Sequence, residues 1–327
     1  MSKKLFSSGK WKRHIARRQR SQLHARQRNR STVVAKRARA IGRPRKPVEL
    51  RLEAPENFSI TQNPHEMSAF IADFRRMLDQ RPIYLDLRGV TTITPDAIVT
   101  LVALVKGDRA TRVRGNFPER QESSTLLIES GFFDHVKTGA PVPRSFKGRI
   151  EKRHSTRVEP ETASGLIRFG LEAAGLEPGA HQACYRGLIE CMSNTHNHAS
   201  GRSARSPEQW WAMVLGNRAT GRVQIAFADT GIGIFGSIKL RGLKKVYRAI
   251  GAVANSKILH DVLEGRVESS TGYPYRGKGL PMVYRDSLNK RIRSLYIIAN
   301  DVFADVERGD YVTLRPGFTG TIVCWEV

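Results

Sequence analysis

Two polar side chains one helical turn apart are the first sign of chemistry in the second half of the chain. Glu190 and Asn194 lie in a segment that we expect to be helical over about 180–199, and His198 extends the series by four residues. At about 100° per residue, all three share one helix face. A carboxylate there can serve as a general base, and an amide oxygen suits Mg²⁺. Taken alone, this spacing is more typical of a solvated face.

A second segment combines an acid with two glycines. Residues 223–229 form an apolar run that predicts a strand ending in Asp229, and Gly231 and Gly233 follow. Glycines let a backbone approach a ligand closely. A carboxylate at a strand end can accept a hydrogen bond from an exocyclic amine such as that of adenine, although an Asp-x-Gly turn is also common without any ligand.

A third segment contains Gly277, Lys278 and Gly279, where a loop enters a helix predicted over about 280–289. Exposed N–H groups and the helix dipole attract phosphate at such a place. Lys278 either adds a positive charge to that site or is an ordinary solvated lysine, and the sequence favours neither. The spacing of these glycines does not match a P-loop.

Alternating strands and helices are expected to position these groups, which indicates an α/β fold in two domains. We place a basic tail at 1–46, a first domain at 47–140, a linker at 141–149 and a second domain at 150–327. In the first domain, strands are predicted near 48–53, 82–87 and 111–117, and helices near 67–78, 95–106 and 122–129. In the second, strands are predicted near 150–158, 209–215, 222–228, 295–299, 311–314 and 321–327, with a further helix near 163–175.

The first domain resembles the STAS fold of anti-sigma-factor antagonists. The resemblance rests on the run 85–93, which enters a helix, and on the run 130–136 near the domain's end. Regulated members carry a phosphorylated Ser before a Gly at that helix start, whereas this chain has Asp96 followed by Ala97. We interpret Asp96 as a first-turn acid favoured by the helix dipole, rather than as an imitation of phosphoserine.

The second domain resembles the ATP-binding domain of the GHKL superfamily, the Bergerat fold shared by DNA gyrase, heat-shock chaperones, sensor histidine kinases and mismatch-repair ATPases. The family's E-x-x-x-N, D-x-G-x-G and G-x-G boxes occur here in the family's order, and a closing Gly-Thr matches the strand whose Thr supports the adenine pocket. The matching residues are Glu190, Asn194, His198, Asp229, Gly231, Gly233, Gly277, Gly279 and Thr321.

This resemblance implies an α/β sandwich with a mixed sheet, and ATP with Mg²⁺ bound under a lid within 235–275. Glu190 would be the catalytic residue and Asn194 a Mg²⁺ ligand. The output would be regulatory, through a protein partner, with phosphate passing either to water or to a protein Ser or Thr. Two alternatives stay open: a nucleotide-gated binding module without significant catalysis, and a nucleic-acid-binding protein.

The charge of the chain supports the last alternative, because the formal net charge is +25 and much of it is local. Residues 1–46 hold 17 Lys or Arg and no acid, while the rest of the chain holds 38 basic and 30 acidic residues. We expect this tail to be disordered in isolation and to bind DNA or RNA. A solubilising leader and a targeting peptide are the competing interpretations.

The longest apolar run, 97–105, is far shorter than the roughly 20 residues that span a bilayer, so it predicts a buried helix and no membrane insertion. Cys184, Cys191 and Cys324 are too few and too unevenly spaced for a disulfide framework or a zinc site. A cytoplasmic location is therefore expected. The sequence does not predict an oligomeric state.

Overall fold

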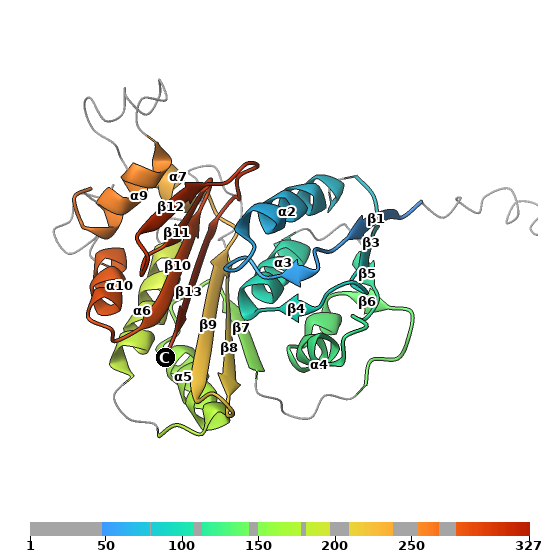
Figure 1. The fold of residues 1–327 in the computed structure, drawn as a ribbon, viewed down its shortest axis with the longest axis horizontal. Helices are drawn as coiled ribbons and strands as arrows, with labels where there is room; N and C mark the ends of the chain where they lie inside the picture. Colours follow the sequence, from blue (N-terminus) through green and yellow to red (C-terminus); the bar gives the residue numbers. More distant parts are fainter. Residues whose placement is uncertain are drawn as a thin grey trace, which may run out of the picture. The chain divides into compact units, whose positions relative to one another are not determined.

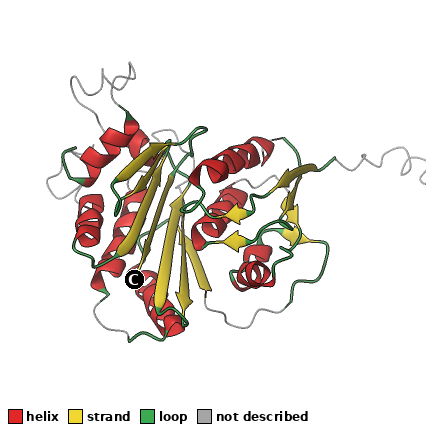
Figure 2. Cartoon of the chain, viewed as in Figure 1, coloured by secondary structure: helices red, strands yellow, loops and turns green. Residues whose placement is uncertain are grey.

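The chain has a mixed α/β structure built on two principal sheets (Figure 1). The structure is a computed structural model that describes residues 48–78, 80–107, 113–143, 150–177, 181–196, 209–237, 254–267 and 279–327. Eight α-helices and one 3₁₀ helix occur within these ranges (Figure 2). Residues Glu49–Val327 form one compact unit. The basic segment 1–46 and most of the expected lid lie outside the described residues.

The first sheet is parallel and has the strand order β1-β3-β5-β6. Its strands are β1 (Leu50–Glu53), β3 (Ile83–Asp86), β5 (Val113–Gly115) and β6 (Lys137–Thr138). Helices α2 (Pro64–Leu78), α3 (Pro95–Gly107) and α4 (Gln121–Glu129) accompany it, as expected from their apolar spacing. The sequence analysis missed β2 (Asn57–Phe58), β4 (Thr92–Ile93), β6 and the 3₁₀ helix Phe132–Asp134, because two or three residues carry no periodicity.

The second sheet has seven strands in the order β12-β11-β10-β13-β9-β8-β7. These are β7 (Ile150–Ser155), β8 (Trp210–Asn217), β9 (Arg222–Asp229), β10 (Arg293–Ala299), β11 (Val302–Asp305), β12 (Asp310–Thr313) and β13 (Thr321–Glu326). Each neighbouring pair is antiparallel, where the resemblance implies a mixed sheet. The reason is that β13 lies between β9 and β10, so these two strands, which run in the same direction, do not pair.

Helices cover one face of this sheet and share its core. They are α5 (Pro160–Ala174), α6 (Gln182–Asn194), α7 (Gly233–Ser237), α9 (Asn255–Leu263) and α10 (Gly279–Leu288). The opposite face packs against α3, which contacts β8, β9 and β13. Trp210 and Trp211 are both buried, one in each of the two hydrophobic cores, which confirms that β8 is packed on both sides.

Burial on all sides explains the composition of α3. Every residue from Ala97 to Leu104 is buried, as expected for a helix that is apolar around its circumference. Asp96 lies in the first turn of this helix and is only 3% exposed. Its carboxylate accepts a hydrogen bond from the Thr61 N–H at 2.9 Å, and burial raises its pKa. These contacts agree with the interpretation of Asp96 as an acid of the first helical turn.

A charged cluster marks the carboxyl end of β3. The Asp86 carboxylate is 4% exposed and accepts hydrogen bonds from Arg88, at 2.9 and 3.0 Å, from Arg51 and from the Asn116 amide at 2.7 Å. The Arg88 hydrogen bond, helped by Asn116 and Arg51, holds the Asp86 pKa well below its usual range, against the opposing effect of burial. This cluster ties β1, β3 and the end of β5 together.

We predict that Asp86→Asn lowers the free energy of unfolding by about 2–3 kcal/mol near pH 7, because both arginines lose a charged acceptor. The folded-state pKa is depressed, so the contribution is present above the ordinary carboxyl pKa and is lost as the pH falls below it. Urea unfolding at about pH 7 and about pH 3 measures both effects. Asp73→Asn, which removes an exposed ion pair with Arg76, is the control and should change little. An equal loss at both pH values would contradict the assignment.

Candidate functional site

Helix α6 carries the first group of predicted site residues, and its apolar face fixes its orientation. Cys184, Leu188 and Cys191 are buried against the second sheet. Glu190 and Asn194 are each half-buried, one helical turn apart, as the sequence predicts. Within the described part of the chain, neither side chain has a hydrogen-bonding partner. His198 lies outside the described residues.

The Glu190 carboxylate lies against the start of α10. A Cβ placed on Gly279 would be 2.1 Å from Glu190 Oε2, so a larger residue there would force the carboxylate to move. Burial raises the Glu190 pKa, since the carboxylate has lost water without gaining a partner among the described residues. Two of the predicted segments therefore meet, although they are 89 residues apart in sequence (190 to 279). Gly277 and Lys278 lie outside the described residues.

Asp229 ends β9 and stands opposite Thr321 of β13 and Trp210 of β8 in the ladder. It is 6% exposed, and its carboxylate accepts a hydrogen bond from the Gly231 N–H at 2.9 Å. Gly320, with φ of +115°, comes so close to the Asp229 carbonyl oxygen that a Cβ would be 2.1 Å from it. The acid and the threonine expected at an adenine pocket are therefore direct neighbours.

One buried thiol lies beside both acids. Burial, together with the nearby charges of Glu190 and Asp229, raises the pKa of the Cys191 thiol. The contact between Glu190 and Gly279 joins the first segment to the glycine of the third, and the charges of Glu190 and Asp229 that act on Cys191 relate the first segment to the second. The raised pKa keeps this thiol protonated, so it is an inert core group and no nucleophile.

The sequence analysis missed Asn300, which contacts the Asp229 turn directly. Its side chain is hydrogen-bonded to the Phe235 N–H and to the Ile232 carbonyl. The available signal was weak: Asn300-Asp301 is a polar pair between two apolar runs, which is typical of a hairpin turn. Nothing local in the sequence connects this pair with a turn about 70 residues earlier.

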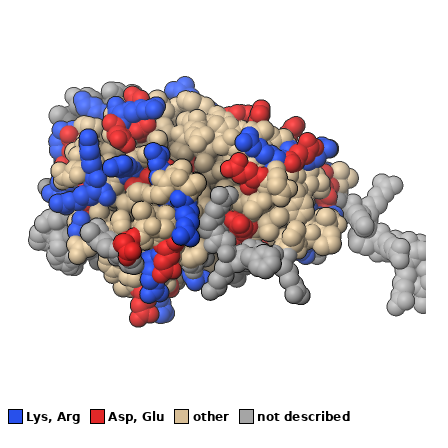
Figure 3. All heavy atoms as spheres, turned by 60° about the horizontal axis from the view of Figure 1, so that its bottom comes forward, with Lys and Arg blue, Asp and Glu red and all other residues tan. Residues whose placement is uncertain are grey.

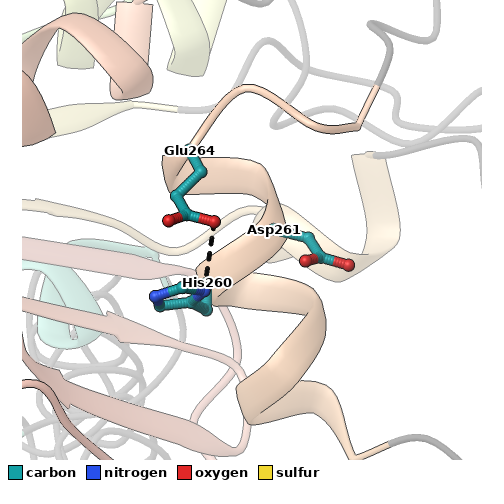
Figure 4. A group of neighbouring side chains, drawn as sticks. All are labelled: His260, Asp261 and Glu264. Carbon is teal, nitrogen blue, oxygen red and sulfur yellow. Dashed lines mark ion pairs between the residues drawn. The ribbon is translucent and has the colours of Figure 1, made fainter.

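A cluster of possible metal ligands occurs elsewhere, on α9. His260, Asp261 and Glu264 each offer a ligand atom within 4.8 Å of the others (Figure 4). The Arg266 guanidinium already contacts all three, at 2.9–3.0 Å from Asp261 and 3.1 Å from His260 Nδ1. Arg266 therefore already pairs with the members of this cluster, which form an ion-pair network.

A cavity of about 680 Å³ lies between the end of α9 and α10. It is lined by Leu263, Glu264, Gly265, Arg266, Pro281, Tyr284 and Arg285. None of the predicted site residues that the structure describes lines it. We therefore assign the candidate site to the Glu190, Asp229 and Gly279 region on the strength of its chemistry, and not to this cavity.

The expected lid, 235–275, is described only in part. Its first residues belong to α7, and α9 lies inside it and buries Ile258, Leu259, Val262 and Leu263. The sequence analysis did not anticipate this helix. The Asn255 amide at its start donates a hydrogen bond to Asp301 Oδ1 at 2.7 Å.

Comparison with known proteins adds no assignment, since no protein-family model and no curated protein matches the chain.

Among the described residues, no helix is both long and apolar enough to cross a membrane. On the face drawn in Figure 3, acidic side chains lie among the basic ones, so the described surface there is not uniformly basic. The predicted nucleic-acid-binding tail, 1–46, lies outside the described residues.

We predict that Glu190→Gln stabilises the protein near pH 7, with a rise in Tm of about 2 °C. The pKa of Glu190 is raised in the folded state. Below the ordinary carboxyl pKa, Glu190 is neutral and costs no stability. Its unfavourable negative charge develops as the pH rises through the raised pKa. The stabilisation should therefore disappear by about pH 4. Thermal unfolding across this pH range, with Glu172→Gln on exposed α5 surface as control, measures it. A variant less stable than the wild type at neutral pH would show that the carboxylate has a stabilising partner.

Proposed function

We propose that residues 150–327 bind ATP with Mg²⁺ in the manner of GHKL proteins, and that nucleotide binding has a regulatory output. The observation that carries this proposal is the contact of Glu190 with Gly279, and the pairing of Asp229 with Thr321 in the sheet supports it. These residues come from four separate segments, and the physical chemistry of each fits one part of a nucleotide.

The adenine end of the proposed site is the buried end of β9. Asp229 offers a carboxylate to an exocyclic amine, and Thr321 stands beside it. A buried acceptor of this kind penalises a base that lacks the matching donor, because the acceptor then remains unpaired. This gives the site a preference for adenine over guanine.

The phosphate end is the start of α10. Helix N-termini attract anions through their N–H groups and dipole, and this helix begins at Gly279, beside the Glu190 carboxylate. The oxygens of Glu190 and Asn194 lie on one face of α6 and suit a hard cation, which makes Mg²⁺ compatible with the residues present. When bound, Mg²⁺ would supply charge neutralisation for the phosphates.

The chemical role proposed for Glu190 follows from its surroundings. A half-buried carboxylate whose pKa is raised by burial is a stronger base than an exposed one. It would orient a water molecule or a protein hydroxyl and accept its proton. ATP hydrolysis and phosphate transfer to a protein Ser or Thr use the same arrangement, so both remain within the proposal.

The regulatory part of the proposal rests on how closely the two halves are joined. The first half has the parallel sheet and helix order that fit an STAS-like domain, and its α3 lies on β8, β9 and β13. The Ser68 hydroxyl and the Arg75 guanidinium donate hydrogen bonds to the carbonyls of Pro316 and Thr319, in the loop that leads to Thr321. The loop before Thr321 thus contacts the STAS-like half and leads into the proposed nucleotide site.

Calorimetric titration with a non-hydrolysable ATP analogue and Mg²⁺ tests the proposal. We expect saturable binding by the wild type and at least about tenfold weaker binding by Asp229→Asn, because a charged acceptor is lost. Asp305→Asn is the matched control: this acid also ends a strand, is also 6% exposed and also accepts a backbone N–H, from Arg308. Absence of binding by a folded wild type would overturn the proposal. An equal loss of analogue affinity in the two variants would show that Asp229 does not contact the nucleotide.

Turnover separates catalysis from a binding switch. We expect Glu190→Gln to bind the analogue within about threefold of the wild type and to lose about 10²–10⁴-fold in ATP turnover, the usual contribution of a positioned general base. Phosphate release under multiple-turnover conditions measures this, with Glu172→Gln as the control. A wild type that binds nucleotide and releases no phosphate would identify a nucleotide-gated module.

A further inference from the structure

The tip of the β10–β11 hairpin consists of two residues, Asn300 and Asp301. Asn300 has φ of +53°, in the left-handed region that asparagine tolerates better than most non-glycine residues. The tip lies beside the turn that follows Asp229. Among the described residues, Asn300 makes two hydrogen bonds through its side chain and two through its backbone.

The side chain of Asn300 holds the residues after Asp229 from both directions. Its Oδ1 accepts a hydrogen bond from the Phe235 N–H at 3.2 Å, and its Nδ2 donates one to the Ile232 carbonyl at 3.0 Å. One side-chain amide thus pairs with a backbone carbonyl before Gly233 and with a backbone N–H after it. Such a pair of bonds fixes the path of the turn, because the two backbone groups must stay at a set separation.

Gly233 has the conformation that this contact requires. Its φ is +72°, and a Cβ built on it would be 2.3 Å from Asn300 Oδ1. The last glycine of the Asp-x-Gly-x-Gly segment is therefore explained by a protein side chain that passes over it, without reference to any ligand.

The backbone of Asn300 contacts the loop before Thr321, which lies on the other side of Asp229. Its N–H donates to the Gly320 carbonyl at 3.3 Å, and its carbonyl accepts from the Phe318 N–H at 2.6 Å. Gly320 in turn lies against the Asp229 carbonyl and precedes Thr321. The same residue therefore contacts both chain segments that flank Asp229.

From this arrangement we infer that Asn300 is a positioning residue for base recognition, which sets the place of Asp229 by clamping the turn after it and the loop before Thr321. This inference rests on the proposed function and deepens it by naming what determines base selectivity. Asn300 acts through Asp229 and contacts no reacting atom. Its neighbour Asp301 accepts the Asn255 hydrogen bond from α9, so the same tip also joins the flank of the expected lid.

The test compares Asn300→Gly with the wild type. Glycine accepts the φ of +53° without strain, so this variant removes the side-chain hydrogen bonds and leaves the backbone conformation available. Lys290→Gly is the matched control, since Lys290 has φ of +54° in a turn after α10. Asn300→Asp is a second variant, which keeps the acceptor for Phe235 and loses the donor to Ile232.

The test needs two measurements, both on the 327-residue chain. Calorimetry with non-hydrolysable ATP and GTP analogues and Mg²⁺ gives the affinity and the preference for adenine, and hydrogen exchange without nucleotide reports on the amides of residues 231–235. For Asn300→Gly we expect about ten- to thirtyfold weaker ATP-analogue binding, a reduced ATP-over-GTP preference and faster exchange at 231–235. Asn300→Asp should lie between this variant and the wild type, and Lys290→Gly should match the wild type.

The outcomes separate this inference from the proposed function. If the wild type binds the ATP analogue and Asn300→Gly keeps its affinity and preference, Asn300 has no positioning role and the proposed function stands. The inference also fails if affinity for both analogues falls equally, because that result indicates general destabilisation. If the folded wild type binds neither analogue, both the proposed function and this inference are wrong.

Discussion

Burial of the central strands on both faces is the constraint on which the rest of the structure depends. β8, β9 and β13 have α5 and α6 on one side and α3 on the other, so the side chains in the middle of each strand are apolar. Such strands leave polar groups only at their ends, where the packing layers stop. Asp229 occupies one of these ends, and its ladder partner Thr321 begins β13 at the same edge. The location of the candidate site follows from where the core ends.

Three acids in the structure illustrate two physical situations. Asp86 and Asp286 are buried with arginine partners, and Asp286 accepts hydrogen bonds from Arg186 and Arg291 at 2.8–3.1 Å. Glu190 is half-buried and has no such partner among the described residues, and its pKa is raised accordingly. A partnered acid stabilises the fold, whereas an unpartnered one costs free energy and is available to a ligand. This contrast is the physical ground for treating Glu190 as functional and the arginine-bound acids as structural.

The two halves of the chain share one hydrophobic core as well as hydrogen bonds. Residues of α2 and α3 belong to the same buried cluster as Trp211 and Phe318, and Ser68 and Arg75 contact the loop that contains Phe318. That loop contacts Asn300 and Gly320, which reach the Asp229 turn. A change in the packing of α2 would therefore shift residues at the candidate site, because a short series of direct contacts connects the two.

The sequence by itself determined the longer elements and the local pattern of the site. Helical spacing identified α2, α5 and α6, continuous apolar runs identified α3 and β9, and periodicity put Glu190 and Asn194 on one helix face, because all of these depend on neighbours within a few residues. Only the tertiary structure decided that Gly279 lies against Glu190, that β13 inserts between β9 and β10 to make the second sheet antiparallel, and that Asn300 clamps the Asp229 turn. These are contacts between residues tens of positions apart, and their partners are chosen by packing of the whole core, which leaves no periodic trace in the chain.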